Sequence, residues 1–293
     1  MKIVIGIPAF NEEKNIGVIL TKLKKISKDI IVCDDGSSDL TAEIAKGLGA
    51  NVISHKRNLG YGAGIRTIFL KAKEINADIL ITFDADGQHR IEDISTILKP
   101  MTNDEADIII GSRFLVENNE IPKYRKIGIK AITSITNSSI GKKLSDSQSG
   151  FRAYNKKILE NITPSESGMG VSTEILIKAS KKKFRITEVP IVVSYEGDTS
   201  TQNPVSHGAS VILSTMKFTS IERPLTFYGI PGMILFSIGL FFIVWTLQIF
   251  SETRQIITNI TLIGIGGIMI GILFLMTAII LYTTVNVVRE KRN

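Results

Sequence analysis

Short apolar runs alternate with amphipathic stretches over residues 1–115 of the chain. The runs are rich in Ile and Val and nearly continuous in apolar character, which is typical of parallel strands covered on both faces. They lie at Ile3–Ile7, Ile30–Cys33, Asn51–Ser54, Ile79–Phe83 and Ile108–Ile110. Between them apolar residues recur at helical spacing, as at Ile16, Ile19, Leu20 and Leu23. The alternation predicts right-handed crossovers and an open, mostly parallel α/β sheet, in which ligands bind beyond the carboxyl ends of the strands.

The pattern is less regular over residues 116–200. We expect helices at Ile127–Ile140 and Val171–Ser180, and strands at Phe151–Tyr154 and Ile186–Tyr195. The segment 201–224 follows this first domain of residues 1–200. Its residues 208–221 predict an amphipathic helix, which either lies at a membrane interface or packs on the domain's own core.

Two long uncharged stretches follow, from Leu225 to Phe250 and from Ile256 to Val288. Each exceeds the roughly 20 apolar residues that a bilayer-spanning helix needs. They predict spans at about 226–250 and 260–286 within residues 225–288, joined as a hairpin by a short loop around Glu252 and Arg254. Residues 289–293 form the tail. The chain is therefore expected to be a multi-pass membrane protein.

Positive residues flank the pair of spans on both outer sides, with Lys217 and Arg223 before it and Arg289, Lys291 and Arg292 after it. By the positive-inside rule this places the N-terminal domain and the tail on the cytoplasmic side. The expected location is a cell membrane or a membrane of the endoplasmic-reticulum type. The apolar stretch within Met1–Glu12 is too short for a signal peptide.

Composition narrows the class further. With 44% hydrophobic and 22% charged residues, disorder, collagen and coiled coil are excluded. The net charge of +7 suits nucleic acid, an anionic membrane surface or phosphorylated ligands. No basic cluster is interleaved with aromatic residues, which argues against nucleic acid as a partner. The single cysteine, Cys33, excludes a disulfide framework and lies in an apolar run that predicts a buried strand residue.

The strongest chemical signal is Asp84-Ala85-Asp86-Gly87-Gln88, directly after an apolar run. Side chains two residues apart point to one side of a strand, so both carboxylates can converge on one point. Their mutual repulsion is relieved by a hard divalent cation, and Gln88 adds a neutral oxygen. A Mg²⁺ or Mn²⁺ ion there would grip a diphosphate through its open positions. A solvated acidic turn is the alternative reading of the same residues.

Polar residues and glycines also follow the other strands. They are Pro8–Glu13 after the first, Asp34-Asp35-Gly36-Ser37 after the second, Gly60, Gly62 and Gly64 after the third, and Gly111-Ser112-Arg113 after the fifth. Carboxylates at strand ends can accept hydrogen bonds from a base or ribose. The glycines have the wrong spacing and place for a dinucleotide-binding fingerprint.

Five motifs in this order resemble the family-two inverting glycosyltransferases with a GT-A fold, a Rossmann-like sheet. They are Pro8–Glu13, Asp34-Asp35-Gly36-Ser37, Asp84-Ala85-Asp86-Gly87-Gln88, Gly111-Ser112-Arg113 and Asp146–Arg152. This set is most similar to the dolichyl-phosphate mannose synthase and polyprenyl-phosphate hexosyltransferase group. The resemblance covers residues 1 to about 200, and a C-terminal pair of spans also occurs in this group. It implies transfer of a single hexose from a nucleoside-diphosphate sugar to a polyprenyl (dolichyl) phosphate, with inversion of the anomeric centre, as in protein glycosylation.

The resemblance also implies residue roles. A nucleotide-sugar site would comprise Pro8, Phe10, Glu12, Cys33, Asp35, Asp84, Ala85, Asp86, Gln88 and Arg113. The metal ligands would be Asp84, Asp86 and Gln88, with Asp84, Asp86 and Arg113 as the catalytic residues. The acceptor phosphate would meet Arg113, Arg125, Arg152 and Ser200. Phe10 stands where the family frequently has tyrosine.

A lipid monophosphate is already an anion near neutral pH, so it can attack the anomeric carbon without a general base. A sugar hydroxyl of a glycolipid would need one, and Glu174 or Asp146 could serve. Glu174 is equally well explained as an acid at a helix N-terminus. A third hypothesis is a nucleotide-sugar-binding membrane scaffold without turnover. The base and sugar of the donor stay open.

Two departures from the family pattern are informative. The only tryptophan, Trp245, lies in the first span, so the Gln-x-x-Arg-Trp motif of processive synthases is absent. Residues Tyr195–Thr201 lack the arginines and lysine usual in mannose-type synthases, which leaves the donor sugar and the route of acceptor-phosphate binding open.

The three histidines and the glycines of the second span are weaker signals. For His89 we expect an exposed turn, with contact to the substrate as the alternative. For His207 we expect a loop, with partial compensation for the missing basic residues as the alternative, and we assign no role to His55. Gly264, Gly267 and Gly271 of the second span could pack against another copy, giving an oligomer, or against the other span of the same hairpin.

Overall fold

The structure, a computed structural model, describes residues 1–116, 121–194, 220 and 224–290. Ser200, His207, residues Tyr195–Thr201 and nearly all of the expected amphipathic segment at 208–221 lie outside the described residues. The chain divides into two compact units, Met1–Thr215 and Met216–Asn293.

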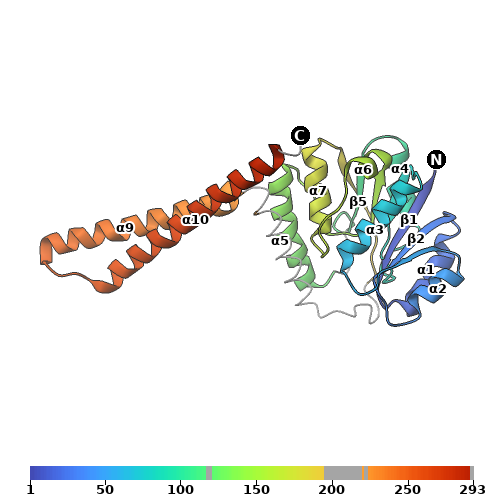
Figure 1. The fold of residues 1–293 in the computed structure, drawn as a ribbon, viewed down its shortest axis with the longest axis horizontal. Coiled ribbons are helices and arrows are strands. Elements are labelled where there is room, and N and C mark those ends of the chain that lie inside the picture. Colours follow the sequence, from blue (N-terminus) through green and yellow to red (C-terminus); the bar gives the residue numbers. More distant parts are fainter. Residues whose placement is uncertain (117–120, 195–219, 221–223, 291–293) are drawn as a thin grey trace. The chain divides into compact units, whose positions relative to one another are not determined.

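The first unit contains a seven-stranded sheet with the order β3-β2-β1-β4-β6-β5-β7 (Figure 1). Its strands are β1 (Ile3–Ala9), β2 (Asp29–Asp34), β3 (Asn51–Ser54), β4 (Ile79–Thr82), β5 (Ile108–Ser112), β6 (Arg152–Asn155) and β7 (Ile186–Pro190). All pairings are parallel except those of β6, which runs antiparallel to β4 and β5. The predicted open, mostly parallel sheet is confirmed. The seventh strand ends at Pro190, short of the predicted Tyr195.

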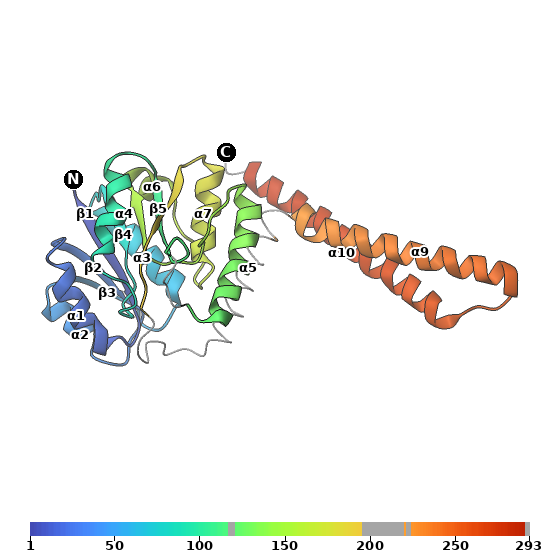
Figure 2. The same ribbon diagram turned by 180° about the vertical axis from the view of Figure 1, so that it is seen from behind.

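Helices follow most strands. They are α1 (Glu13–Leu23), α2 (Thr41–Gly47), α3 (Tyr61–Glu74), α4 (Asp93–Thr102), α5 (Lys123–Ile140), α6 (Lys156–Asn161) and α7 (Val171–Lys181). The short α6 was not predicted from the sequence. It begins at Asn155, whose side chain accepts a hydrogen bond from the Ile158 backbone N–H at 3.1 Å. Helices α5 and α7 lie side by side in both ribbon views (Figures 1 and 2).

Both faces of the sheet are covered, which explains why its strands are apolar throughout. Ile5 and Ile7 of β1 share a buried cluster with Leu20 of α1 and Ile97 of α4. Gly6 points to the opposite face, where a Cβ atom would collide with Ile68 of α3. The helices cover the two faces of the sheet but not the carboxyl ends of its parallel strands. Polar residues gather at that edge, where ligands bind in sheets of this kind.

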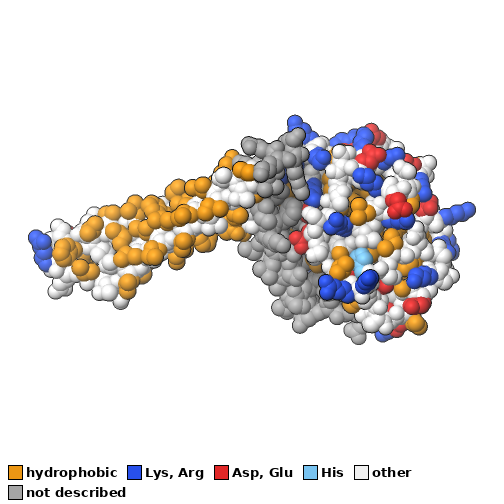
Figure 3. Space-filling view, viewed as in Figure 1, with side chains coloured by type: hydrophobic (Ala, Val, Ile, Leu, Met, Phe, Trp, Pro, Cys, Tyr) orange, Lys and Arg blue, Asp and Glu red, His pale blue; other side chains and the backbone are white. Residues whose placement is uncertain are grey.

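The second unit is a pair of apolar helices, α9 (Ile230–Thr253) and α10 (Thr258–Glu290), preceded by a π-helical turn at Leu225–Gly229. The segments Leu225–Thr253 and Thr258–Val285 have mean hydropathies of 2.2 and 2.5 and are long enough to cross a membrane. Apolar side chains cover the visible face of this hairpin, whereas charged side chains are spread over the first unit (Figure 3). These two helices are a candidate membrane hairpin, close to the predicted spans.

Glycines make the contact between α9 and α10. A Cβ atom on Gly239 would lie 2.5 Å from the Ile268 nitrogen, and one on Gly271 would lie 2.6 Å from the Phe236 nitrogen. Gly267 lies against Gly239 in the same way. The glycines of the second span therefore serve the packing of the hairpin itself.

Candidate active site

The carboxyl ends of β1, β2, β4 and β5 meet at one edge of the sheet, as parallel pairing requires. The loop before β6 joins them, because β6 is antiparallel and begins at this edge. Arg152, the first residue of β6, pairs with Thr82, the last of β4, and the Thr82 hydroxyl donates to the Gly150 carbonyl at 2.6 Å. Most of the predicted site residues thus lie at this edge.

Asp84 is held by two side chains from separate loops. The Tyr61 hydroxyl donates to Oδ1 at 3.1 Å, and Nε2 of His89 lies 3.3 Å from Oδ2. Burial raises the pKa of Asp84, but the hydrogen bonds from His89 and Tyr61 and the charge of Arg113 outweigh it, so the pKa is below its ordinary value. This carboxylate is held in its ionised form.

The pKa of Asp86 is shifted in the opposite direction, above its ordinary value. Burial and the charge of Asp84 raise its pKa, while Arg125 opposes the shift. Burial raises the pKa of Glu12 as well, with smaller contributions from Asp86 and Asp84. The three carboxylates therefore share one negative field at the strand ends, which a cation would relieve.

The donor set at Asp84, Asp86 and Gln88 consists of oxygens, which is the chemistry that Mg²⁺ and Mn²⁺ prefer. Among the described residues there is no group of three or more His, Cys, Asp or Glu side chains arranged to hold a metal. Two carboxylates and an amide leave positions for further oxygens, such as those of a diphosphate. The residues fit a divalent ion that is shared with a substrate.

Both carboxylate oxygens of Asp35 accept hydrogen bonds from the protein itself. Its Oδ1 accepts hydrogen bonds from the Leu59 N–H at 2.9 Å and from Nδ1 of His55 at 2.6 Å, and its Oδ2 accepts from the Gly60 N–H at 2.8 Å. The carboxylate thereby fixes the glycine-rich loop that leads into α3. His55, which had no predicted role, follows β3 directly at the same edge, and its position after a strand is the signal that could have identified it.

Two residues assigned to the nucleotide-sugar site have buried side chains. Cys33 is fully buried, as its apolar surroundings predicted, and burial raises the pKa of its thiol to about 12. Ala85 packs in the core cluster. Because both side chains are buried, the predicted contact with a nucleotide would be made by their backbone.

The loops after β1 and β2 are joined to each other. Asn11 adopts a left-handed conformation with φ of 55°. Its N–H donates to the Ser37 hydroxyl and its Oδ1 accepts from the Ser38 N–H, both at 2.9 Å. Pro8, in β1, lies against Gly64 of α3. Phe10 and Glu12, half-buried, follow on the same loop. Asn11 and Ser37 shape this side of the edge, and their pairing across 26 positions is not visible in the sequence.

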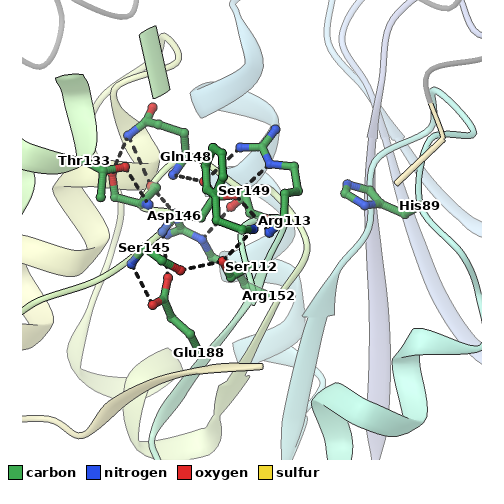
Figure 4. Close-up of polar contacts among 12 residues, drawn as sticks. His89, Ser112, Arg113, Thr133, Ser145, Asp146, Gln148, Ser149, Arg152 and Glu188 are labelled. Atoms are coloured by element: carbon green, nitrogen blue, oxygen red, sulfur yellow. Dashed lines mark hydrogen bonds and ion pairs between the residues drawn. The ribbon is translucent and has the colours of Figure 1, made fainter. Parts of the chain in front are cut away.

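Arg113 forms a bidentate ion pair with Asp146 (Figure 4). Nε lies 2.7 Å from Oδ2 and Nη2 lies 2.9 Å from Oδ1. The Asp146 side chain is fully buried, and although burial raises its pKa, Arg113 lowers it below the ordinary value. A carboxylate so engaged is poorly suited to take a proton from a substrate, which counts against Asp146 as a general base.

Glu174 is also engaged by the chain. It accepts hydrogen bonds from the Ser165 hydroxyl and from the N–H groups of Ser165 and Glu166, and pairs with Lys178. Its side chain is fully buried, and these contacts lower its pKa against the effect of burial. Glu174 lies in the first turn of α7, which agrees with the prediction of an acid at a helix N-terminus, and its carboxylate also holds the preceding loop.

Arg152 departs from its predicted role at the acceptor phosphate. It is 1% exposed, and its guanidinium donates to the carbonyls of Ser149, Ser172 and Ser147 at 2.8, 3.0 and 2.7 Å. A buried arginine whose guanidinium donates to three backbone carbonyls positions the loop before β6 instead of meeting a ligand. His89 departs as well: its side chain is 6% exposed, not in an exposed turn.

The sheet order, the polar carboxyl edge and the paired carboxylates define a GT-A glycosyltransferase. The model of glycosyl transferase family 2 matches residues 4–163, and the chain belongs to this family. A UDP-N-acetylglucosamine–dolichyl-phosphate N-acetylglucosaminyltransferase of Methanococcus voltae is 35% identical, with 71% of this chain and 89% of that protein covered. A dolichyl-phosphate hexose transferase of Haloferax volcanii is 29% identical over 76% of this chain and 95% of its own.

Solved structures agree on the fold. The crystal structure of glucosyl-3-phosphoglycerate synthase from Mycobacterium tuberculosis, in complex with Mn²⁺, UDP-glucose and phosphoglyceric acid, superposes with a TM-score of 0.59. It is 18% identical and covers 75% of this chain and 80% of that one.

Proposed function

We propose that this enzyme transfers a single hexose from a nucleoside-diphosphate sugar to a polyprenyl (dolichyl) phosphate, with inversion, at the cytoplasmic face of a membrane. Relatives named for dolichyl-phosphate transfer support the acceptor class. The apolar hairpin supports it too, because a lipid acceptor explains why a soluble catalytic unit is joined to membrane helices. The positive flanks of the hairpin support the cytoplasmic orientation.

The observation that carries the choice of acceptor is that both candidate bases are engaged by the protein. Asp146 is paired with Arg113, and Glu174 holds the loop at Ser165. A hydroxyl acceptor needs a base to remove its proton, whereas a lipid monophosphate arrives as an anion. The geometry therefore supports the phosphate acceptor over the hydroxyl of a glycolipid.

Asp84, Asp86 and Gln88 would hold Mg²⁺ or Mn²⁺, which supplies charge neutralisation for the departing diphosphate. Arg113 and Arg125 bring positive charge to the same carboxylates, as the pKa shifts of Asp84 and Asp86 indicate. These residues align two anionic groups that would otherwise repel each other. Pro8, Phe10, Glu12 and Asp35 would border the nucleoside.

The test is a donor screen on membranes that contain the full-length chain. Labelled nucleotide sugars with uracil or guanine are incubated with polyprenyl phosphate and Mg²⁺ or Mn²⁺, and the lipid phase is extracted. We expect label in the lipid phase with one class of donor, and none for Asp86→Ala. Lipid-phase label with a glycolipid acceptor alone would support the hydroxyl mechanism. Nucleotide-sugar binding without any product would support a scaffold.

A further inference from the structure

Three contacts from separate loops close around the Asp84 carboxylate. The Tyr61 hydroxyl reaches Oδ1, and Nε2 of His89 reaches Oδ2. On a third side lies Gly150, where a Cβ atom would come within 2.5 Å of Oδ2 and 2.8 Å of Oδ1. The carboxylate therefore has one orientation that satisfies all three neighbours.

The histidine ring is placed for this one contact. It packs between Phe83 and Phe151, with ring centroids 5.8 and 5.2 Å away. Its Nδ1 is buried and has no hydrogen-bond partner within the part of the chain that the structure describes. Because Asp84 only accepts, the hydrogen of the neutral ring belongs on Nε2. An unpaired buried nitrogen costs stability, so packing alone does not explain a histidine at this position.

Tyr61 is also held in place from outside the site. It opens α3 between Gly60 and Gly62, and the Gly62 N–H donates to the Ser167 carbonyl at 2.8 Å. A Cβ atom on Gly60 would lie 2.5 Å from that same carbonyl oxygen, so the two backbones touch. The loop that carries Ser167 is in turn tied by the Glu174 carboxylate through Ser165 and Glu166. A chain of contacts thus leads from Glu174 to the hydroxyl that orients Asp84.

We propose that Tyr61 and His89 are positioning residues that fix the Asp84 carboxylate in the orientation in which, with Asp86, it holds a divalent cation. This inference rests on the proposed function, because it assumes that Asp84 and Asp86 bind the ion. Hydrogen-bond partners of a ligating carboxylate fix its direction, and removing such partners commonly weakens metal binding by about 10-fold to 100-fold.

The test measures Mn²⁺ binding directly, by electron paramagnetic resonance of free Mn²⁺ titrated against the detergent-solubilised full-length protein, with and without UDP. Tyr61→Phe removes one donor and keeps the ring. His89→Leu removes the other, whereas His89→Gln restores an N–H near the position of Nε2. Gly150→Ala pushes against the carboxylate itself. The matched control is Ser27→Ala, which removes a buried hydrogen bond to the Ile3 carbonyl, at 2.7 Å, near the start of β1.

We expect Tyr61→Phe, His89→Leu and Gly150→Ala each to weaken Mn²⁺ binding about tenfold. His89→Gln should stay within about threefold of the wild type, and Ser27→Ala should leave Mn²⁺ binding unchanged while lowering the unfolding temperature. Unchanged Mn²⁺ affinity in Tyr61→Phe and His89→Leu overturns the inference, whatever their unfolding temperatures.

The same titration separates this inference from the function beneath it. If the wild type binds Mn²⁺ and Asp86→Ala does not, the metal site stands, and only the variants of Tyr61 and His89 decide the inference. A wild type that binds no Mn²⁺ with or without UDP overturns both.

Discussion

Two pairs of acidic residues lie at the same edge of the sheet but differ in their hydrogen-bond partners. Asp34 ends β2 and Asp35 follows it, while Asp84 and Asp86 follow β4, and β1 lies between the two strands. The first pair accepts backbone hydrogen bonds from its own and a neighbouring loop, at Ser37, Leu59 and Gly60. Asp84 is met by side chains, and the pKa of Asp86 is raised by burial and by the charge of Asp84.

Asp34 and Asp35 hold loops through hydrogen bonds, whereas Asp84 and Asp86 form the pair that we propose binds a cation. A carboxylate that backbone N–H groups surround is satisfied without a ligand. Two partly buried carboxylates that repel each other have an unfavourable interaction, which a divalent ion relieves. Sequence spacing alone does not distinguish the two pairs, because both are acids directly after a buried strand.

Replacing Asp86 should give the largest effect. Asp86→Ala removes one of the proposed metal ligands and relieves the repulsion with Asp84. We expect sugar transfer to fall by about 10²-fold to 10³-fold or more, with an unfolding temperature no lower than that of the wild type. Transfer assays and thermal unfolding of the same preparation measure both. A variant that keeps its activity would remove Asp86 from the site.

Among these variants, Asp35→Ala should lower the free energy of unfolding the most. It removes the shared acceptor of the Leu59 N–H, the Gly60 N–H and the His55 ring, so we expect the free energy of unfolding to fall by about 3 kcal/mol. Chemical unfolding followed by circular dichroism measures this. If the free energy of unfolding stays the same and only nucleotide binding is lost, Asp35 belongs with the ligand-binding pair instead.

The strands of the sheet could be predicted from the sequence because parallel strands that are buried on both faces are continuous runs of apolar residues. Strand β3 was predicted at its observed bounds, and the end of each other parallel strand except β7 within two residues. The site was predicted as a set of positions but not as a set of partners. Arg113 and Asp146 are 33 residues apart, and Tyr61 and Asp84 are 23 apart. Such pairings depend on loop conformation, which apolar periodicity does not encode, so His55, His89 and Tyr61 went without a role.

Glu174 extends the comparison to a third acid that serves the backbone. Glu174→Gln keeps one acceptor but loses the charge that pairs with Lys178, so we expect a loss of about 2 kcal/mol at pH 7. Because the folded pKa is lowered, the ionised form stabilises the fold above the ordinary glutamate pKa of about 4.3. That contribution is lost as the pH falls through the folded value. The difference between wild type and variant should therefore shrink below about pH 4, and a constant difference would contradict this reading.

Asp34→Asn should have the smallest effect. The Oδ1 atom of Asp34 accepts the Ser37 N–H at 3.1 Å, and an asparagine oxygen can accept the same bond. We expect the free energy of unfolding to change by less than about 1 kcal/mol. Thermal unfolding is sufficient to check it. A large loss would mean that the charge of Asp34, and not only its oxygen, is needed at this edge.

The most direct test of the account is a calorimetric titration of UDP and GDP into the full-length protein, with and without Mn²⁺. If the acids after β4 hold an ion that grips the diphosphate, Mn²⁺ should raise the affinity of the wild type for one of the two nucleotides at least about tenfold. It should not change the affinity of Asp86→Ala. An equal dependence on Mn²⁺ in both proteins, or none in the wild type, would contradict the assignment of the metal site to Asp84 and Asp86.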